Sequence, residues 1–167
     1  MLRDLHEELG IPADYGRAGG PPAYAEAREL VEVGPNLVGR MQRLTPEAAR
    51  QWQAMVAAAD QVGIQLLIVS GYRGVDYQAG LRKKIEAGQA IGEILRVNAA
   101  PGHSEHHTGR AVDIATPGSR PLTEEFEQTD AFRWLTSRAV EFGFSLTYPR
   151  DNPWGIAYEP WHWSLKD

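Results

Sequence analysis

Cysteine is absent from the 167-residue sequence, which excludes disulfide bonds and thiolate metal ligands. This absence is compatible with both a reducing and an oxidising compartment. No apolar run approaches the roughly 18 residues that a membrane-spanning helix needs. The formal net charge is −5 and no basic cluster is present, so nucleic acid is not an expected partner. Internal repeats and low-complexity segments are also lacking, and nothing in the sequence predicts a second domain.

The rest of the composition is that of an ordinary soluble globular protein. Hydrophobic residues make up 43% and charged residues 23% of the chain, and its 167 residues are enough for one domain with a sizeable core. The first residues, MLRDLHEELGIPADYG, carry acids early and no apolar segment, unlike a secretory signal peptide. Three alternatives for localisation stay open: the cytoplasm, the cell envelope or periplasm after removal of a leader, and export by another route.

The stretch PGHSEHHTGRAVDIA, residues 101–115, holds the first candidate metal ligands. His106 and Asp113 lie seven residues apart, and the helical zinc motif with two histidines around a Glu is absent, so these ligands must come from separate elements. The run AVDIA at Ala111–Ala115 predicts a strand whose branched residues face the core while Asp113 faces away. Each candidate has an ordinary alternative, as a surface-loop His and a solvent-facing strand Asp.

A second candidate region is YEPWHWSL near the C-terminus. In a strand, His162 would point away from the two tryptophans beside it, which would fix the strand against the core. Glu159 lies three residues before His162, so a straight strand would place the two on opposite faces. A bend at Pro160 is needed to bring Glu159 beside a metal, where a carboxylate can act as general base. An exposed Glu and an incidental His are the alternatives.

Hydrophobic periodicity and turn signals predict the remaining elements. Residues 1–43 are expected to wrap the core as a lid or packing arm, with short helical pieces. The predicted helices are Asp4–Glu8, Tyr24–Val31, one that starts at Thr45 and ends at Gly63, Val75–Ala87 and Asp130–Phe142 with a cap at Thr129; the predicted strands are Ile64–Val69, Ala111–Ala115, Phe144–Tyr148 and the YEPWHWSL segment.

Three motifs together resemble one known family. The pattern S-x-H-x-x-G-x-A-x-D is met by Ser104, His106, Gly109, Ala111 and Asp113; E-x-x-H is met by Glu159 and His162; and SGYR stands at residues 70–73. The chain resembles the zinc D-alanyl-D-alanine carboxypeptidases, a group that includes vancomycin-resistance carboxypeptidases and dipeptidases. Lysostaphin-type endopeptidases and the hedgehog signalling domain are more distant relatives. The resemblance covers about residues 44–165, most of the chain.

The resemblance implies a set of roles for named residues. One zinc ion per chain would be bound by His106, Asp113 and His162, with Glu159 as the catalytic base. Arg73 would contact the substrate carbonyl and stabilise the oxyanion.

Further residues are candidates for substrate binding. Ser104, Arg73 and Arg150 are candidates for the terminal carboxylate of the substrate, and Gln78 is a candidate substrate contact that could reach Arg73. A surface Arg is an equal alternative for Arg150. His103 is expected to be a loop residue, since a fourth protein ligand would close the catalytic position. His107 stands where the family commonly has Gln, which puts nearby substrate contacts in question.

We expect a single α+β domain, in which helices pack on a mainly antiparallel sheet and the zinc site lies on the exposed side of the sheet. Residues 1–43 would form an N-terminal arm and residues 44–167 the zinc peptidase domain. The predicted function is a zinc-dependent carboxypeptidase that hydrolyses a bond next to a D-amino acid in peptidoglycan stem peptides of the D-Ala-D-Ala type.

Several alternatives to this function stay open. An L,D-carboxypeptidase or a peptidoglycan endopeptidase could use the same site. A non-catalytic zinc-stabilised binding module is a rival from another class, although such a site needs neither Glu159 nor Arg73. A sugar- or peptide-binding domain with an incidental His cluster is the third, and lack of bound metal would favour it.

Overall fold

The computed structural model describes residues 1–78 and 80–167, without the side chains of Tyr77 and Gln78. Its main sheet has four antiparallel strands in the order β3-β4-β6-β5, and a separate hairpin pairs β1 with β2. The strands are β1 Val31–Pro35, β2 Met41–Leu44, β3 Leu67–Ser70, β4 Ala111–Ala115, β5 Phe144–Leu146 and β6 His162–Leu165. The α-helices are α1 Leu2–Glu8, α2 Pro46–Asp60, α3 Val75–Gln78, α4 Leu81–Glu86, α5 Ile91–Val97 and α6 Asp130–Arg138. Short 3-10 helices are η1 Glu105–Thr108, η2 Glu124–Gln128 and η3 Ala139–Phe142.

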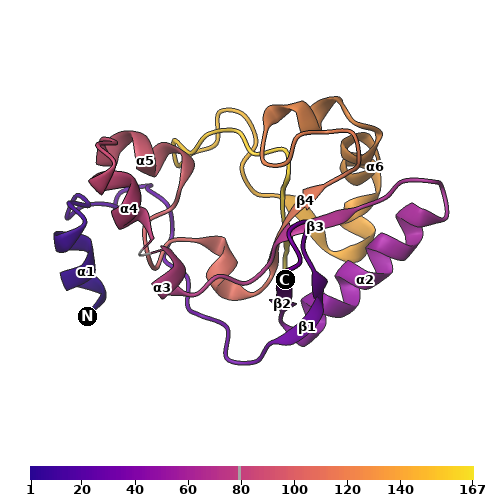
Figure 1. The fold of residues 1–167 in the computed structure, drawn as a ribbon, viewed down its shortest axis with the longest axis horizontal. Helices are drawn as coiled ribbons and strands as arrows, with labels where there is room; N and C mark the ends of the chain where they lie inside the picture. Colours follow the sequence, from indigo (N-terminus) through magenta and orange to yellow (C-terminus); the bar gives the residue numbers. More distant parts are fainter. Residues whose placement is uncertain (79) are drawn as a thin grey trace.

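Helices α2 and α6 pack with the main sheet around the large hydrophobic core, as Figure 1 shows at one end of the molecule. Val112 and Ile114 of β4 and Trp163 of β6 are buried in this core together with Met55 of α2 and Leu135 of α6. Helices α1, α4 and α5 gather at the other end (Figure 1), around a smaller cluster. The expected α+β class with an antiparallel sheet is confirmed. Within the described residues, no helix has the length and apolar character to cross a membrane.

Several predicted elements are confirmed by their local chemistry. The hydroxyl of Thr45 accepts a hydrogen bond from the N–H of Ala48 and caps α2, which has Pro46 in its first turn. Thr129 caps α6 in the same way. Strand β4 has the predicted bounds, and its branched residues face the helical core.

Other predictions from the sequence were wrong, and tertiary contacts explain the differences. The predicted helix at 24–31 is irregular instead, because the N–H groups of Tyr24 and Ala27 donate to the carbonyls of Gly102 and His107 rather than to their own helix. The β1-β2 hairpin was missed altogether. The predicted helix 75–87 is two helices, α3 and α4.

Strand bounds also differ from prediction. Strand β3 runs from Leu67 to Ser70, later than the predicted Ile64–Val69, and β5 ends at Leu146, before Tyr148. Strand β6 begins only at His162 because the preceding residues form a turn. The segments before β3 and β6 and after β5 are therefore less regular than the apolar pattern alone indicates.

Gly71 sits where the β1-β2 hairpin approaches the end of β3, and a side chain there is expected to destabilise the fold. A Cβ at this position would lie 2.7 Å from the carbonyl oxygen of Arg43, to which the N–H of Tyr72 donates. Gly71→Ala should lower the free energy of unfolding by about 1–3 kcal/mol, measured by denaturant titration. Gly92→Ala is the matched control, because nothing lies within 4 Å of its Cβ inside α5. The control should be neutral or slightly stabilising, and equal effects of the two substitutions would contradict the prediction.

Candidate active site

The register of the main sheet places two of the candidate ligands, Asp113 and His162, side by side. Asp113 of β4 is paired directly with His162 of β6 on one side and with Ser70 of β3 on the other. The second pairing depends on an irregularity between Ile68 and Ser70, where β3 shifts by one residue. Residues directly opposite on an antiparallel pair have side chains on the same face. Asp113 and His162 therefore share the face turned away from the helical core.

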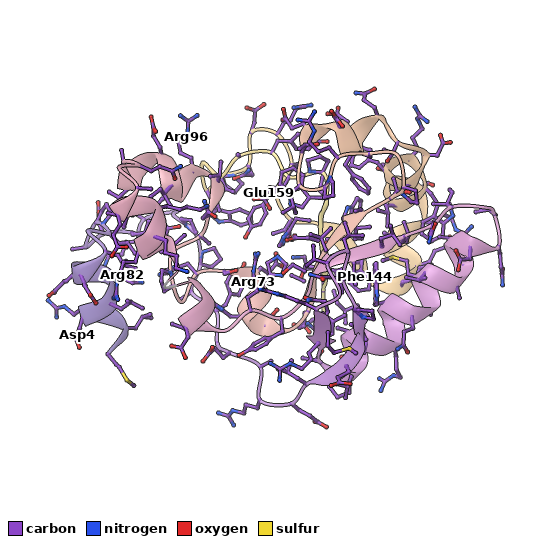
Figure 2. The ribbon with its side chains drawn as sticks, in the orientation of Figure 1. Asp4, Arg73, Arg82, Arg96, Phe144 and Glu159 are labelled. Carbon is purple, nitrogen blue, oxygen red and sulfur yellow. The ribbon has the colours of Figure 1, made fainter. Side chains whose placement is uncertain are left out.

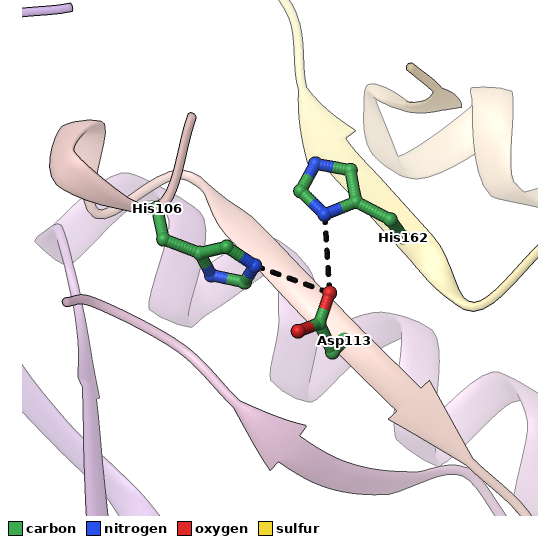
Figure 3. Close-up of side chains that lie close together, drawn as sticks. All are labelled: His106, Asp113 and His162. Atoms are coloured by element: carbon green, nitrogen blue, oxygen red, sulfur yellow. Dashed lines mark hydrogen bonds and ion pairs between the residues drawn. The ribbon is translucent and has the colours of Figure 1, made fainter. Parts of the chain in front are cut away.

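Asp113 joins the two histidines that the sequence predicted as metal ligands (Figure 3). Its Oδ1 lies 3.1 Å from Nε2 of His106 and 3.1 Å from Nδ1 of His162. His106 reaches this point from η1, and its ring stands edge-on to that of His162, with centroids 4.9 Å apart. All three residues are buried, with no more than 3% of any of them exposed.

The geometry and chemistry of this group fit a metal ion. One ligand atom from each of His106, Asp113 and His162 lies within 4.8 Å of the others. Nδ1 of His106 lies 2.7 Å from the carbonyl oxygen of Gly71, which can only accept a hydrogen bond, so Nδ1 carries the proton and Nε2 keeps its lone pair for a ligand. Two imidazoles and one carboxylate are a donor set of catalytic zinc sites, which keep a fourth position open.

Charges in this buried group follow from its hydrogen bonds. Burial, reinforced by the nearby charge of Arg73, lowers the pKa of His106 to about 4, so its ring is neutral at pH 7. Burial also opposes charge on His162, but hydrogen bonds to Asp113 and Glu105 prevail and raise the pKa of His162 to about 10. Although burial alone would raise it, the histidines and Arg73 hold the pKa of Asp113 well below its usual range. A bound cation would take the place of the proton on Nδ1 of His162, since metal ligands must be deprotonated.

Glu159 reaches the site through a turn rather than along a strand. The N–H of His162 donates to the carbonyl of Glu159, which closes the turn around Pro160, as the expected bend required. Oε2 of Glu159 then lies 3.7 Å from Nδ1 of His162. Burial raises the pKa of Glu159 to about 7, and the negative charge of Asp113 acts in the same direction. A carboxyl group with such a pKa can both accept and return a proton near neutral pH.

Arg73 lies in the loop that follows β3, and its side chain approaches the same group of residues. Its Nη1 lies 3.9 Å from Oδ2 of Asp113. Its N–H donates to the carbonyl of His106, and Nδ1 of His107 donates to its carbonyl at 2.6 Å. Figure 2 shows Arg73 and Glu159 in the middle of the molecule, between the main sheet and the helices at the far end. An arginine whose backbone is held in this way, with its guanidinium beside Asp113, is suited to stabilise negative charge that develops on a bound carbonyl.

A cleft of about 660 Å³ leads to these residues. Its wall near the site includes Ser104, which is buried, and a second wall comes from α4, α5 and the two residues after α5. Residues from outside the predicted site also line the cleft; they include Leu81, Lys83, Lys84, Asn98, Glu105, Leu122, Tyr148, Ile156 and Trp161. The face of β4 that carries Asp113 is thus covered by protein and reaches solvent through this cleft.

One predicted substrate contact, Arg150, does not lie at the site, and another, Gln78, is not described. Arg150 is not among the described residues that line the cleft; its guanidinium pairs with Glu124 and Glu127 and stacks over the ring of Tyr158. The side chain of Gln78 lies outside the described residues. His103 donates from Nδ1 to the carbonyl of Pro21 and holds the N-terminal segment, which agrees with its expected role as a loop residue.

Comparison with known proteins assigns the chain to a family. The sequence profile of the VanY family, described as D-alanyl-D-alanine carboxypeptidase, matches residues 41–166. The chain belongs to the VanY family. The resemblance carried by the three motifs is thereby confirmed.

Individual members of the VanY family and related structures agree with this assignment. The putative carboxypeptidase YodJ of Bacillus subtilis (strain 168) is 35% identical over 176 residues, which cover 97% of this chain and 58% of that protein. The LdcB LD-carboxypeptidase structure is 31% identical with a TM-score of 0.75, covering 86% of this chain and 71% of that one. The vancomycin-resistance D,D-pentapeptidase VanY from a VanB-type cassette, solved as a mutant with Zn(II), is 27% identical with a TM-score of 0.63, covering 87% and 82%.

His107, at the position where the resemblance to the family predicts Gln, has a supporting role that both side chains can fill. Its Nδ1 donates to the carbonyl of Arg73, and its Nε2 accepts from the N–H of Gly102 at 3.0 Å. A Gln amide also has one donor and one acceptor end. We expect His107→Gln to keep stability within about 1 kcal/mol, whereas His107→Leu should lose about 1–3 kcal/mol because buried polar groups are left unpaired.

Thermal unfolding of both His107 variants checks this prediction, with hydrolysis rates as a second measurement. His107→Leu should also lower activity, because the carbonyl that fixes Arg73 loses its donor. Equal stability of the Gln and Leu variants would show that the hydrogen bonds at this position contribute nothing.

One further residue at the site was not predicted from the sequence. Glu105 is buried and hydrogen-bonded to Nε2 of His162, yet the S-x-H motif does not specify the residue at this position. An acid beside a candidate ligand was the only available signal. Its side chain is 5% exposed, and such burial cannot be read from the sequence of a short loop.

Proposed function

We propose that this chain is a zinc-dependent carboxypeptidase that releases a C-terminal D-amino acid from peptidoglycan stem peptides. The observation that carries the proposal is the buried His106–Asp113–His162 group with Glu159 beside it and Arg73 above it. A site that only stabilised the fold would need neither of the last two residues. Zinc itself is supported by the donor set and by the VanY structure that holds Zn(II).

The chain's own residues account for the proton transfers and the charge stabilisation. His106, Asp113 and His162 would hold the zinc ion, which when bound polarises a water molecule and the substrate carbonyl. Glu159 accepts the proton of the attacking water and returns it to the departing amine, for which a pKa of about 7 is suited. Arg73 donates hydrogen bonds to the carbonyl oxygen as it becomes negative. Ser104 lies buried in the cleft wall, where its hydroxyl can bind the terminal carboxylate.

The specificity has two candidates within this class. A D,D-carboxypeptidase acts on a pentapeptide stem ending in D-Ala-D-Ala, which is the activity named for the family. An L,D-carboxypeptidase acts on the tetrapeptide stem, and the LdcB structure, at a TM-score of 0.75, is more similar in fold than the D,D-pentapeptidase at 0.63. Either activity would place the carbonyl of its scissile bond at the same residues, although that carbonyl belongs to the fourth residue of a pentapeptide stem and to the third residue of a tetrapeptide stem.

The experiment is elemental analysis for zinc together with mass spectrometry of defined tetrapeptide and pentapeptide stems. We expect one zinc ion per chain and loss of one D-Ala from at least one stem. Loss from the pentapeptide alone selects the D,D activity, and loss from the tetrapeptide alone selects the L,D activity. Internal cleavage without release of D-Ala would replace a carboxypeptidase with an endopeptidase, and absence of zinc after reconstitution would overturn the proposal.

A further inference from the structure

The Glu105 carboxylate is hydrogen-bonded through both of its oxygens beside the candidate metal group. Oε2 lies 2.9 Å from Nε2 of His162, and Oε1 lies 2.6 Å from Nζ of Lys166. Nζ of Lys166 also donates to the hydroxyl of Thr147 at 3.1 Å. The Glu105 side chain is only 5% exposed, whereas that of Lys166 is 45% exposed. A buried carboxylate with two fixed donors has one orientation available to it.

The contact with Glu105 decides which nitrogen of His162 can bind a metal. Nδ1 of His162 faces Asp113, the side on which the three ligand atoms gather. Nε2 faces Glu105. A carboxylate can only accept, so Nε2 must carry a proton, and Nδ1 is the nitrogen that keeps its lone pair when a cation is present. The protein thus selects the tautomer and fixes the ring plane of His162.

Lys166 is placed for this contact by the backbone after β6. Its N–H donates to the carbonyl of Gly143 at 2.9 Å, which extends the alignment of β6 with the start of β5. Thr147, its second partner, directly follows β5. The ammonium group therefore reaches Glu105 from the residue that follows β6, the strand that carries His162.

We propose that Glu105 is a positioning residue for the metal centre: it orients His162 through Nε2, and Lys166 holds it as an acceptor-only carboxylate. The inference rests on the proposed zinc function. Carboxylates behind a zinc-bound histidine typically raise metal affinity or activity by roughly 10–100-fold. Glu105 needs no contact with substrate for this role.

Substitution of Glu105 by Gln tests the role of the acceptor. In Glu105→Gln, the amide oxygen is drawn towards the ammonium of Lys166, so the NH₂ group turns towards His162. Two donors would then face each other, and the His162 tautomer with its proton on Nδ1 would be favoured, which is the wrong one for a metal. We expect the zinc dissociation constant to rise about 10–100-fold, measured by competition with a chromophoric chelator.

Removal of Lys166 provides the decisive comparison. Lys166→Met alone leaves Glu105 as an acceptor and should change the zinc dissociation constant only a few-fold. In the double variant Glu105→Gln with Lys166→Met, the amide oxygen is free to face His162, so zinc affinity should recover most of what the single Glu105 variant loses. Glu141→Gln, which changes an exposed acid paired with Arg138, is the matched control and should leave zinc affinity unchanged.

A merely structural role for Glu105 makes the opposite prediction. If the residue only filled space or stabilised the fold, the double variant would bind zinc no better than the single one, and that result would overturn the inference. The inference also fails if Glu105→Gln binds zinc within about threefold of wild type while the wild-type chain binds one zinc ion. A wild-type chain that binds no zinc removes the proposed function and the inference together. Thermal unfolding of the metal-free variants confirms that each of them is folded.

Discussion

Glu159→Gln is expected to retain zinc and to lose about 10²–10⁴-fold in kcat, the range that a positioned general base contributes. Its carboxylate lies beside His162 but is not part of the group of atoms that can hold the metal. The Gln amide has nearly the same shape, so the substrate and metal sites keep their form. It cannot accept a proton from water, and the chemical step is lost. Steady-state hydrolysis of a D-Ala-terminated stem peptide, with zinc content measured on the same sample, provides the comparison.

The substitution also tests what burial does to Glu159. Because its pKa is raised by burial, the folded protein favours the neutral carboxyl group. A neutral amide is therefore not expected to destabilise the fold, and the metal-free variant should unfold at the same temperature as wild type or higher. Glu127→Gln, which changes an acid paired with Arg150, is the control and should keep full activity. Full activity of Glu159→Gln would remove Glu159 as the base.

The structure brings together His106, Asp113 and His162, as the resemblance implied, and some features of their arrangement follow from short-range constraints in the sequence. His106 and Asp113 are separated by one turn at Gly109, whose φ of +66° places it in the left-handed region where Gly is favoured. The alternation of AVDIA predicted which face of β4 Asp113 occupies. The bend at Pro160 could be deduced from the odd spacing between Glu159 and His162. These are short-range constraints, and the structure agrees with each of them.

Long-range contacts could not be predicted in the same way. Asp113 and His162 are 49 residues apart, and their direct pairing depends on the register of β4 with β6, which no local pattern specifies. The link from Glu105 to Lys166 spans 61 residues and is visible only once both are placed. The irregular conformation of residues 24–30 likewise depends on backbone hydrogen bonds to Gly102 and His107, which lie far from it in the sequence. A propensity argument has no access to those partners.

His162→Ala is expected to abolish stoichiometric zinc binding. The substitution removes one of the three candidate metal ligands. It also removes the hydrogen bonds that His162 donates to Asp113 and Glu105. Zinc affinity should therefore fall by more than the roughly 10–100-fold that loss of an outer partner costs. The metal-free variant should also unfold more easily, by about 3–5 kcal/mol, because two buried carboxylates lose the cation between them. Zinc content after dialysis and denaturant titration of the metal-free proteins measure the two effects.

His6→Ala separates these effects from the general consequence of losing a histidine. His6 donates from Nε2 to the carbonyl of Pro101 and contributes no atom to the ligand group. This control should keep one zinc ion per chain. Undiminished zinc in His162→Ala would take His162 out of the ligand set. Zinc loss with unchanged stability would mean that Asp113 and Glu105 find other partners, because a buried carboxylate without a donor is strongly disfavoured.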